Sequence, residues 1–520
     1  MKTNKMTTLT KNNRRRFFIF LLFIVMFSAC RSSEQATNSE DVLPTNEESF
    51  TVPTPNINLA KPLEISNRTE DLALAKKIDE MIEKSEFADA RWGVFVVSLK
   101  DGRVLAARDG QKLFTPASVQ KLLTSVVALD KLGADFRWKT SVFALNKIEN
   151  GVLDGDLILY GQGAPDLSDE GIENLANQLK AKGLQKVKGN IIGDESFFTG
   201  DNFGDGWTWN ELQWYYGAEA SALSINRNEV KLNLQNGKPT ASTTFMQVSG
   251  EVKPNQNGEV ESIGVKRELG ENRVYVWGEG KNLDVRVAMQ NPALWSAKIF
   301  KEALQKKGIV VEGEAKEANW KTEPKLDIAT STELATVESQ TLAEIVRKMN
   351  KDSVNLYAEL ILRTLGKKFG DSAPDENPKI QKTRGDDSAG TSVIKKWLTE
   401  KGVTFQETET IRDGSGLSRL NFVTPETIGR ALIAAAQIKT AETFKISLPI
   451  AATDGTLRGR LGSVRGKILA KTGSITYINS LAGYAQNERE TLAFVILCNN
   501  ETRKADSSVL IDAIAESLAN

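Results

Sequence analysis

Two short patterns in the chain pair a serine hydroxyl with a lysine amine. Ser118 and Lys121 are separated by two residues, and Ser392 and Lys395 repeat the same spacing. Residues three apart on a helix share one face, so each amine can lie beside its hydroxyl. A neutral lysine in that position can act as the base that activates a serine nucleophile. Taken alone, however, either pair is more often an ordinary helix turn.

Two further patterns indicate that Ser118 and Lys121, rather than Ser392 and Lys395, form the catalytic pair. Ser353 and Asn355 flank a single residue, and a Lys-Thr-Gly run begins at Lys471. The order Ser-x-x-Lys, Ser-x-Asn, Lys-Thr-Gly holds only from Ser118, because Ser392 follows Ser353 in the chain. This ordered triplet is the signature of penicillin-recognising serine acyl-enzymes.

The amino-acid composition excludes catalytic sites that depend on histidine or on several cysteines. The chain of 520 residues has no histidine and only two cysteines. A Ser-His-Asp triad, a Cys-His dyad and a His-ligated zinc site are therefore impossible, and so is a thiolate metal cluster. Hydrolytic chemistry in this chain requires serine, lysine or carboxylate groups.

The local sequence predicts the elements that position these residues. Thr115 is a suitable N-cap and Pro116 suits the first helical position, so we expect a helix from there to a stop at Gly133. Ser118 would lie in its first turn, near the positive end of the helix dipole. Helical periodicity resumes near Leu342, ahead of Ser353, and Lys471 lies in a strand-like run beside an antiparallel meander.

Longer segments around the motifs resemble those of class C low-molecular-weight penicillin-binding proteins, the D-alanyl-D-alanine carboxypeptidase/endopeptidase family. The likeness covers roughly residues 70–520, and a long insert of 231 residues between the first two motifs is typical of this class. One departure is Gly163-Ala164-Pro165, where the family often has Gly-Asp-Pro. The resembling segments are residues 114–121, 350–359, 413–418 and 454–457.

The resemblance implies an α+β fold. Its catalytic domain is penicillin-binding/β-lactamase-like, with an antiparallel sheet between helices on both faces. Two nested β-rich inserted domains would interrupt it. We expect the catalytic domain at 66–139 and 336–520, the outer insert at 140–221 and 291–335, and the inner insert at 222–290. The inserts carry no motif residue, so we expect acylation itself not to depend on them.

The resemblance and the chemistry together imply catalytic roles for three residues. Ser118 attacks the carbonyl of a D-alanyl-D-alanine amide in a peptidoglycan stem peptide. Lys121 serves as its base if burial and the nearby Lys471 lower its pKa. Ser353 relays a proton to the leaving amine. No cofactor and no metal are implied, and β-lactam antibiotics are expected to act as covalent inhibitors.

Five residues are expected to bind the substrate. Asn355 holds Lys121 and the substrate amide. Lys471 and Thr472 bind the terminal carboxylate, and Gly473 lets the strand approach the substrate closely. The family implies an oxyanion hole from the backbone N–H groups of Ser118 and Ser474.

Two other functions remain open at this stage. A serine β-lactamase would share the three motifs, but its Glu-x-x-Leu-Asn element should follow the second motif. The run Glu229-Val-Lys-Leu-Asn233 precedes it, so we interpret that run as a strand. A non-catalytic envelope binding lipoprotein could keep the fold, although the complete set of motif residues argues against this.

The N-terminus predicts export. Residues 1–29 carry six basic residues and no acidic one, with an apolar run at 17–27, as in a signal peptide. Small residues before Cys30 resemble a lipobox, so we expect lipidation there and a flexible tether over 30–65. An ordinary signal peptide is the alternative. The rest of the chain has 61 basic and 67 acidic residues. The predicted location is therefore the bacterial cell envelope or periplasm, with a lipid anchor in a membrane and no nucleic-acid partner.

Overall fold

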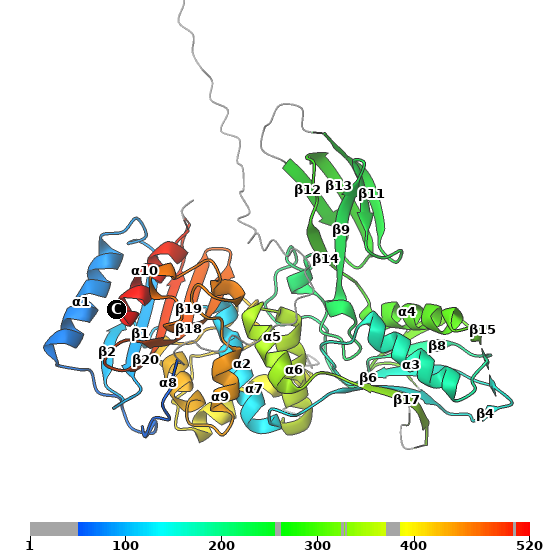
Figure 1. The fold of residues 1–520 in the computed structure, drawn as a ribbon, viewed down its shortest axis with the longest axis horizontal. Coiled ribbons are helices and arrows are strands. Elements are labelled where there is room, and N and C mark those ends of the chain that lie inside the picture. The colour runs from blue at the N-terminus through cyan, green and yellow to red at the C-terminus, as the bar shows by residue number, and fades with distance from the viewer. Residues whose placement is uncertain (1–49, 255–261, 324–326, 328–329, 371–384, 503–505) are drawn as a thin grey trace, which may run out of the picture. The chain divides into compact units, whose positions relative to one another are not determined.

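A computed structural model describes residues 50–254, 262–323, 327, 330–370, 385–502 and 506–520 (Figure 1). The predicted signal peptide and Cys30 lie outside these residues. Within the described part of the chain, none of the helices is long and apolar enough to cross a membrane.

The central element is a five-stranded antiparallel sheet that joins the two ends of the described chain. Cross-strand pairing of Arg91 with Asn499 brings the first strand beside the last one. The first two strands in the chain form an antiparallel hairpin, with Gly102 in its turn at a φ of 78°. In spatial order the strands are β18 (Ile468–Ile475), β19 (Ile478–Gln486), β20 (Thr491–Asn499), β1 (Arg91–Ser98) and β2 (Val104–Arg108).

Helices cover both faces of this sheet (Figure 1). On one face, α1 (Thr69–Glu83) and α10 (Ser508–Ala519) pack over an apolar cluster that includes Val94 and Val96. On the other face, Phe95 and Val97 join a second cluster beneath α8 (Pro425–Ala435). Strands buried on both sides read as continuous apolar runs, which explains the sequence of β1. The predicted α+β class with an antiparallel sheet between helices is confirmed.

The second apolar cluster also holds the helices that carry the motifs. It gathers residues from helices on both sides of the long insert, including Leu123, Val346 and Ile361. The motif segments are therefore anchored in one common core although the sequence separates them widely. These helices are α2 (Lys121–Leu132), α5 (Leu342–Lys351), α6 (Asn355–Phe369), α7 (Asp386–Glu400) and α9 (Ala441–Ser447).

The described residues of the insert form four further sheets. The largest has the order β16-β8-β6-β3-β17 and is packed by α3 (Asp169–Ala181) and α4 (Pro292–Lys306). Its strands are β3 (Lys139–Ala144), β6 (Leu157–Gly161), β8 (Ile191–Asp194), β16 (Ala315–Ala318) and β17 (Thr332–Glu338). A smaller sheet joins β4 (Ile148–Glu149), β5 (Val152–Leu153), β7 (Lys186–Val187) and β15 (Val310–Val311).

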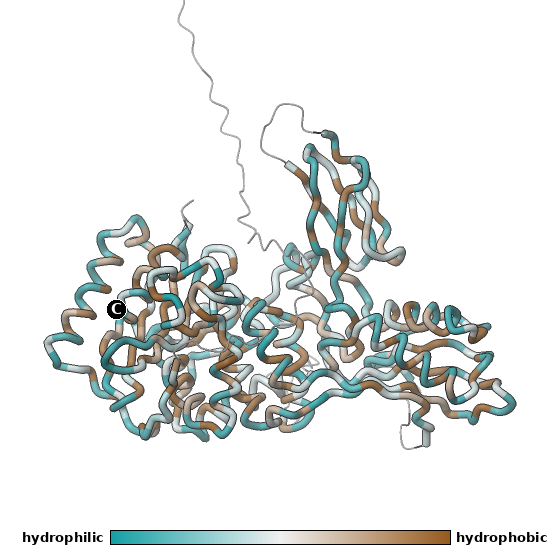
Figure 2. The backbone as a smooth tube through the Cα atoms, viewed as in Figure 1, coloured by the Kyte–Doolittle hydropathy of each residue, from teal (hydrophilic) through white to brown (hydrophobic). Residues whose placement is uncertain are grey.

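Two three-stranded sheets fall in the predicted inner insert. They are β10-β9-β14 and β11-β13-β12. Hydrophobic and hydrophilic residues alternate along their strands (Figure 2). A single apolar cluster includes Leu159 of the outer segment and Val276 of the inner one, so the exact domain boundaries stay a prediction. The strands are β9 (Glu229–Gln235), β10 (Lys238–Ala241), β11 (Gln247–Lys253), β12 (Ser262–Arg267), β13 (Arg273–Glu279) and β14 (Val285–Ala288).

The tether predicted over residues 30–65 must be shortened. Residues 30–49 lie outside the described residues, but residues 50–65 pack against the catalytic core. Leu59 is 3% exposed, and its carbonyl accepts a hydrogen bond from Arg430 at 3.0 Å. Gln437 donates to the carbonyl of Ile57 at 2.9 Å. This segment is polar on average but contains a few apolar residues. The free energy gained by burying them offsets the loss of conformational entropy when the segment becomes ordered.

Candidate active site

Ser118 does not lie in the first turn of an α-helix as the sequence predicts. A short 3₁₀ turn, η1 (Ala117–Gln120), carries it, and α2 begins only at Lys121. Thr115 does not cap this helix: Pro116 is the residue that precedes η1, and no side-chain hydrogen bond caps η1 or α2. Asn499 at the end of β20 binds the backbone of Thr115 instead. The amide group of Asn499 accepts from the N–H of Thr115 at 2.8 Å and donates to its carbonyl at 3.1 Å. The predicted stop is confirmed, with Gly133 as the C-cap at a φ of 83°.

The amine of Lys121 is buried and makes three hydrogen bonds. It contacts Ser118 Oγ at 2.9 Å, Asn355 Oδ1 at 2.7 Å and the carbonyl of Ser415 at 2.8 Å. The side chain is 0% exposed, and burial lowers the pKa of Lys121 to about 7. The charges of Asp413 and Glu359 oppose this shift. A neutral amine beside a half-buried serine is the arrangement that general-base activation requires.

The second motif lies at the joint between two helices. Ser353 follows α5, has a φ of 58°, and accepts a hydrogen bond from Lys471 Nζ at 3.0 Å. Asn355 begins α6, and its Nδ2 donates to the carbonyl of Tyr216 at 2.9 Å. Asn355 therefore links Lys121 to a backbone segment of the outer insert.

The third motif occupies the outermost strand of the central sheet, β18. Lys471 is 0% exposed, and burial, followed by the charge of Lys121, holds the pKa of Lys471 well below its ordinary value. Thr472 is partly buried and its hydroxyl bonds that of Thr456 at 2.8 Å, while the neighbouring Ser474 is exposed. A Cβ atom at Gly473 would lie 2.9 Å from the backbone nitrogen of Ser118. Only glycine lets the strand approach the serine this closely.

The structure thus brings together two hydroxyls and two buried amines. Lys121 bonds Ser118, and Lys471 bonds Ser353. One amine can receive the proton of an attacking hydroxyl, and the second pair can deliver a proton to a departing group. A strand edge next to Ser118 can align an extended peptide.

The other Ser-x-x-Lys copy has an ordinary structural role. Ser392 lies on the exposed side of α7, and its hydroxyl donates to the carbonyl of Ser388 in the preceding turn at 3.1 Å. Glu229, which begins the misplaced Glu-x-x-Leu-Asn run, lies at the start of β9 and pairs with Arg286 at 3.1 Å.

The resembling segment 413–418 forms a loop that holds Lys121 from the far side, a role that the sequence did not predict. Ser415 presents its carbonyl to Lys121, and Asp413 accepts the N–H groups of Gly416 at 2.9 Å and Ser418 at 2.7 Å. Beneath this loop, Glu359 Oε1 accepts from the N–H groups of Gly414 at 3.1 Å and Ser415 at 2.8 Å. An acidic residue beside two glycines was the available signal, because such loops turn tightly around a carboxylate.

The outer insert also contacts the site, and the expectation that acylation itself does not depend on the inserts stays a prediction. The carbonyl of Tyr216 binds Asn355, and Trp207 Nε1 donates to Asp413 at 2.9 Å. The inner insert braces this same segment, because the buried Arg267 donates to the carbonyl of Leu212 at 2.5 Å.

We expect the variant Glu359→Gln to remain active near pH 7. Burial raises the pKa of Glu359 to about 8, so the side chain is largely a neutral acid at pH 7, which glutamine mimics. Glu359→Ala should lose about 1–3 kcal/mol of unfolding free energy for each N–H group left unsatisfied, together with acylation activity. Thermal melts and penicillin acylation rates would test this. If Glu359→Gln lowered the melting temperature and the acylation rate as much as Glu359→Ala, the carboxyl group itself would be needed.

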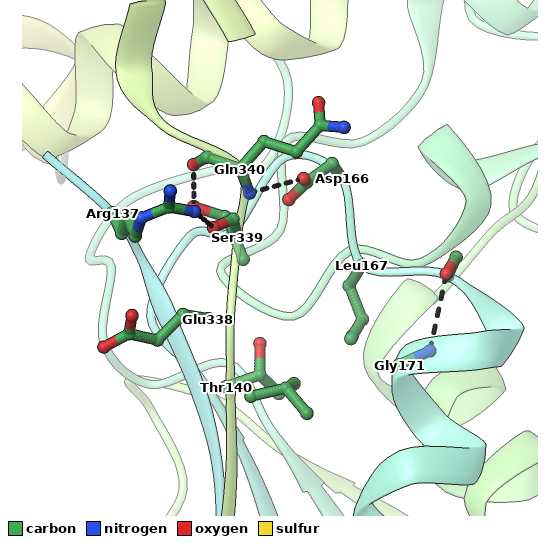
Figure 3. Close-up of a pocket in the computed structure, with 11 residues that line it drawn as sticks. Arg137, Thr140, Asp166, Leu167, Gly171, Glu338, Ser339 and Gln340 are labelled. Carbon is green, nitrogen blue, oxygen red and sulfur yellow. Dashed lines mark hydrogen bonds between the residues drawn. The ribbon is translucent and has the colours of Figure 1, made fainter. Parts of the chain in front are cut away.

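A separate surface cavity of about 350 Å³ lies where the insert leaves and rejoins the core (Figure 3). Asp166 accepts from the N–H of Gln340 at 2.8 Å, and Arg137 donates to the carbonyl of Ser339 at 2.6 Å. The first bond ties the loop after Gly163-Ala164-Pro165 to the segment after β17, and the second ties the segment before β3 to it. None of the residues that line the cavity belongs to the three motifs.

Comparisons with known proteins agree with the geometry. The family model described as "D-Ala-D-Ala carboxypeptidase 3 (S13) family" matches residues 74–520. A D-alanyl-D-alanine carboxypeptidase of Actinomadura sp. (strain R39) is 29% identical over 475 residues, covering 86% of this chain and 84% of the relative. A D-alanyl-D-alanine carboxypeptidase of Haemophilus influenzae is 29% identical over 425 residues, covering 78% of this chain and 85% of the relative.

Solved structures of one such protein are also similar. The crystal structure of penicillin binding protein 4 from Haemophilus influenzae matches with a TM-score of 0.72 and 28% identity, over 85% of this chain and 98% of that one. The same protein in complex with a β-lactam matches with a TM-score of 0.67 and 26% identity, over 85% of this chain and 98% of that one.

Proposed function

The chain belongs to the D-Ala-D-Ala carboxypeptidase 3 (S13) family, and from this premise we propose that it hydrolyses peptidoglycan stem peptides through an acyl-enzyme on Ser118. The observation that carries this proposal is the buried Lys121 amine, 2.9 Å from Ser118 Oγ. The chain is a serine-type carboxypeptidase by family. The residues that perform the reaction are part of the proposal.

The acylation step follows from the hydrogen bonds around Ser118. Lys121 takes the hydroxyl proton as Ser118 Oγ forms a bond to the carbonyl carbon of the penultimate D-alanine. The amide C–N bond then breaks, and the departing terminal D-alanine receives a proton through Ser353, which Lys471 contacts at 3.0 Å. The backbone N–H groups of Ser118 and Ser474 are proposed to stabilise the oxyanion.

Substrate binding is proposed along the edge of β18. The terminal carboxylate lies against Lys471 and Thr472, and its charge favours the protonated form of the buried Lys471. Asn355 holds the amide of the substrate, and Gly473 leaves space for the backbone to approach. Water then hydrolyses the ester, with Lys121 again as the base.

β-Lactams are proposed to acylate the same serine. The comparison structure of Haemophilus influenzae penicillin binding protein 4 contains a bound β-lactam, and its fold matches this chain. The leaving group of an opened β-lactam stays attached to the acyl group, so it continues to obstruct water. A stable adduct is therefore expected, whereas a β-lactamase would turn the compound over.

The reaction can be tested with a short peptide that ends in D-alanyl-D-alanine. The purified enzyme should release D-alanine, and penicillin should stop the release in proportion to the adduct formed. Cross-linked muropeptides, analysed by mass, would separate carboxypeptidase from endopeptidase activity. Rapid hydrolysis of penicillin without peptide cleavage would favour the β-lactamase alternative.

The family acts on the cell wall, so the protein works in the cell envelope. We propose that residues 1–29 direct export and that a lipid on Cys30 anchors the protein to a membrane. Polar residues 31–49 would then link the anchor to the packed segment that begins at Phe50.

The variant Cys30→Ala should shift the protein from the membrane fraction to the soluble envelope fraction. It should also lose incorporation of a labelled fatty acid. Cys498 is the only other cysteine and is buried in the core, so Cys498→Ala is a matched control that should keep the label. Unchanged fractionation of Cys30→Ala would contradict the anchor.

A further inference from the structure

One face of the inner insert exposes aromatic side chains. Tyr275 and Trp277 on β13 are 52% and 44% exposed, whereas the alternating Val274 and Val276 are fully buried. The rings of Tyr275 and Trp277 stack with centroids 5.5 Å apart and an interplanar angle of 18°. The sheet thus presents two nearly parallel rings to solvent, while the alternating valines pack into the apolar cluster on its other face.

A glycine on the next strand allows Trp277 to lie flat. Gly264 pairs with Trp277 across β12 and β13. A Cβ atom at Gly264 would lie 2.3 Å from the indole ring, so any other residue would force the ring away. The indole therefore covers the bare backbone and turns its opposite face outward.

Polar side chains border the two rings. The cross-strand partners of Tyr275 are Ser249 on β11 and Lys266 on β12, and Glu251 is the partner of Trp277. Cross-strand partners share one face of a sheet. Hydrogen-bond donors and acceptors therefore surround the rings of Tyr275 and Trp277.

The aromatic surface continues toward the active site. Lys266 Nζ lies 5.3 Å from the ring centroid of Trp209, which is 65% exposed. Two residues earlier, Trp207 bonds Asp413 in the loop that holds Lys121 through Ser415. The exposed rings therefore begin beside the candidate site and extend over the inner sheet.

We propose that Trp209, Lys266, Tyr275 and Trp277 bind the glycan strand whose stem peptide enters the active site. The faces of pyranose rings carry C–H groups that stack on aromatic faces, and the hydroxyl and acetamido groups can bond Ser249, Glu251 and Lys266. Exposed rings rimmed by polar groups mark a binding surface. The proposal rests on the proposed function, because only a polymeric substrate presents sugars next to the peptide.

Calorimetric titration with a β-1,4-linked tetramer of N-acetylglucosamine tests the surface. Trp277→Ala should weaken binding about tenfold, and Tyr275→Ala should weaken it less, because tyrosine presents a smaller ring. Leu269→Ala is a matched control, since Leu269 is 50% exposed in the turn of the same module. Digestion of intact cell-wall sacculi should fall with binding, while hydrolysis of a short D-alanyl-D-alanine peptide stays within twofold.

Penicillin acylation separates this proposal from the proposed function. Trp277→Ala should be acylated at the wild-type rate, which also shows that the variant is folded. Tetramer binding that is equal in wild type and Trp277→Ala would overturn the glycan surface, as would no binding by the wild type. A change in oligomeric state on mutation would instead identify the face as a contact between copies. Failure of wild-type acylation would count against the proposed function alone.

Discussion

The variant Ser118→Ala should lose peptide hydrolysis and penicillin labelling by about a thousandfold or more. Removing the hydroxyl leaves no nucleophile beside Lys121, and effects of this size follow loss of a catalytic serine. Ser118 is only half-buried, so the alanine variant should fold normally. Release of D-alanine and fluorescent penicillin labelling would measure the loss.

The second Ser-x-x-Lys copy provides the matched control for this variant. Ser392→Ala should keep full activity, because its hydroxyl serves only an exposed turn of α7. If Ser118→Ala still forms the adduct, the assignment of the nucleophile is wrong. If Ser392→Ala loses it, the chosen motif order is wrong as well.

The variant Lys121→Arg should slow penicillin acylation by a factor of about 10²–10⁴, the usual contribution of a general base. A guanidinium stays charged at any useful pH and cannot accept the serine proton. In the wild type, burial lowers the pKa of Lys121 to about 7, so the neutral amine predominates above that pH. Acylation should therefore increase as the pH rises through about 7.

The increase in acylation rate with pH should be absent in Lys121→Arg. Lys395→Arg is the matched control, because it alters the lysine of the second copy, and it should keep both the rate and the pH profile. Stopped-flow acylation between pH 5 and 9 would show the difference. A near-normal rate for Lys121→Arg would identify another group as the base.

The sequence predicts which motif residues come together, because each motif is defined by side-chain types and spacings that a sequence displays directly. Ser118 and Asn355 bond Lys121, and Ser353 bonds Lys471. The charge of Lys121 also acts on Lys471, so the two groups lie close together. Local patterns likewise predict the helix that ends at Gly133, the helix that begins at Leu342 and the strand that carries Lys471. These features depend on residue type and local periodicity, which a sequence displays directly.

Contacts made by distant backbone groups could not be predicted. Asn499 lies 384 residues after Thr115 and binds its backbone, a contact that no local pattern displays. The carbonyl groups of Ser415 and Tyr216 support the site, yet any residue supplies a carbonyl. Their positions are set by the loops that carry them, and the sequence gives no direct signal of such a contact.

Localisation of the penicillin adduct in the wild-type protein tests the central claim most directly. The acylated enzyme would be digested, and the modified peptide would be sequenced by tandem mass spectrometry. The account predicts one adduct, carried by Ser118 in the turn before α2. An adduct on Ser392, on Ser353 or on any other residue would contradict it.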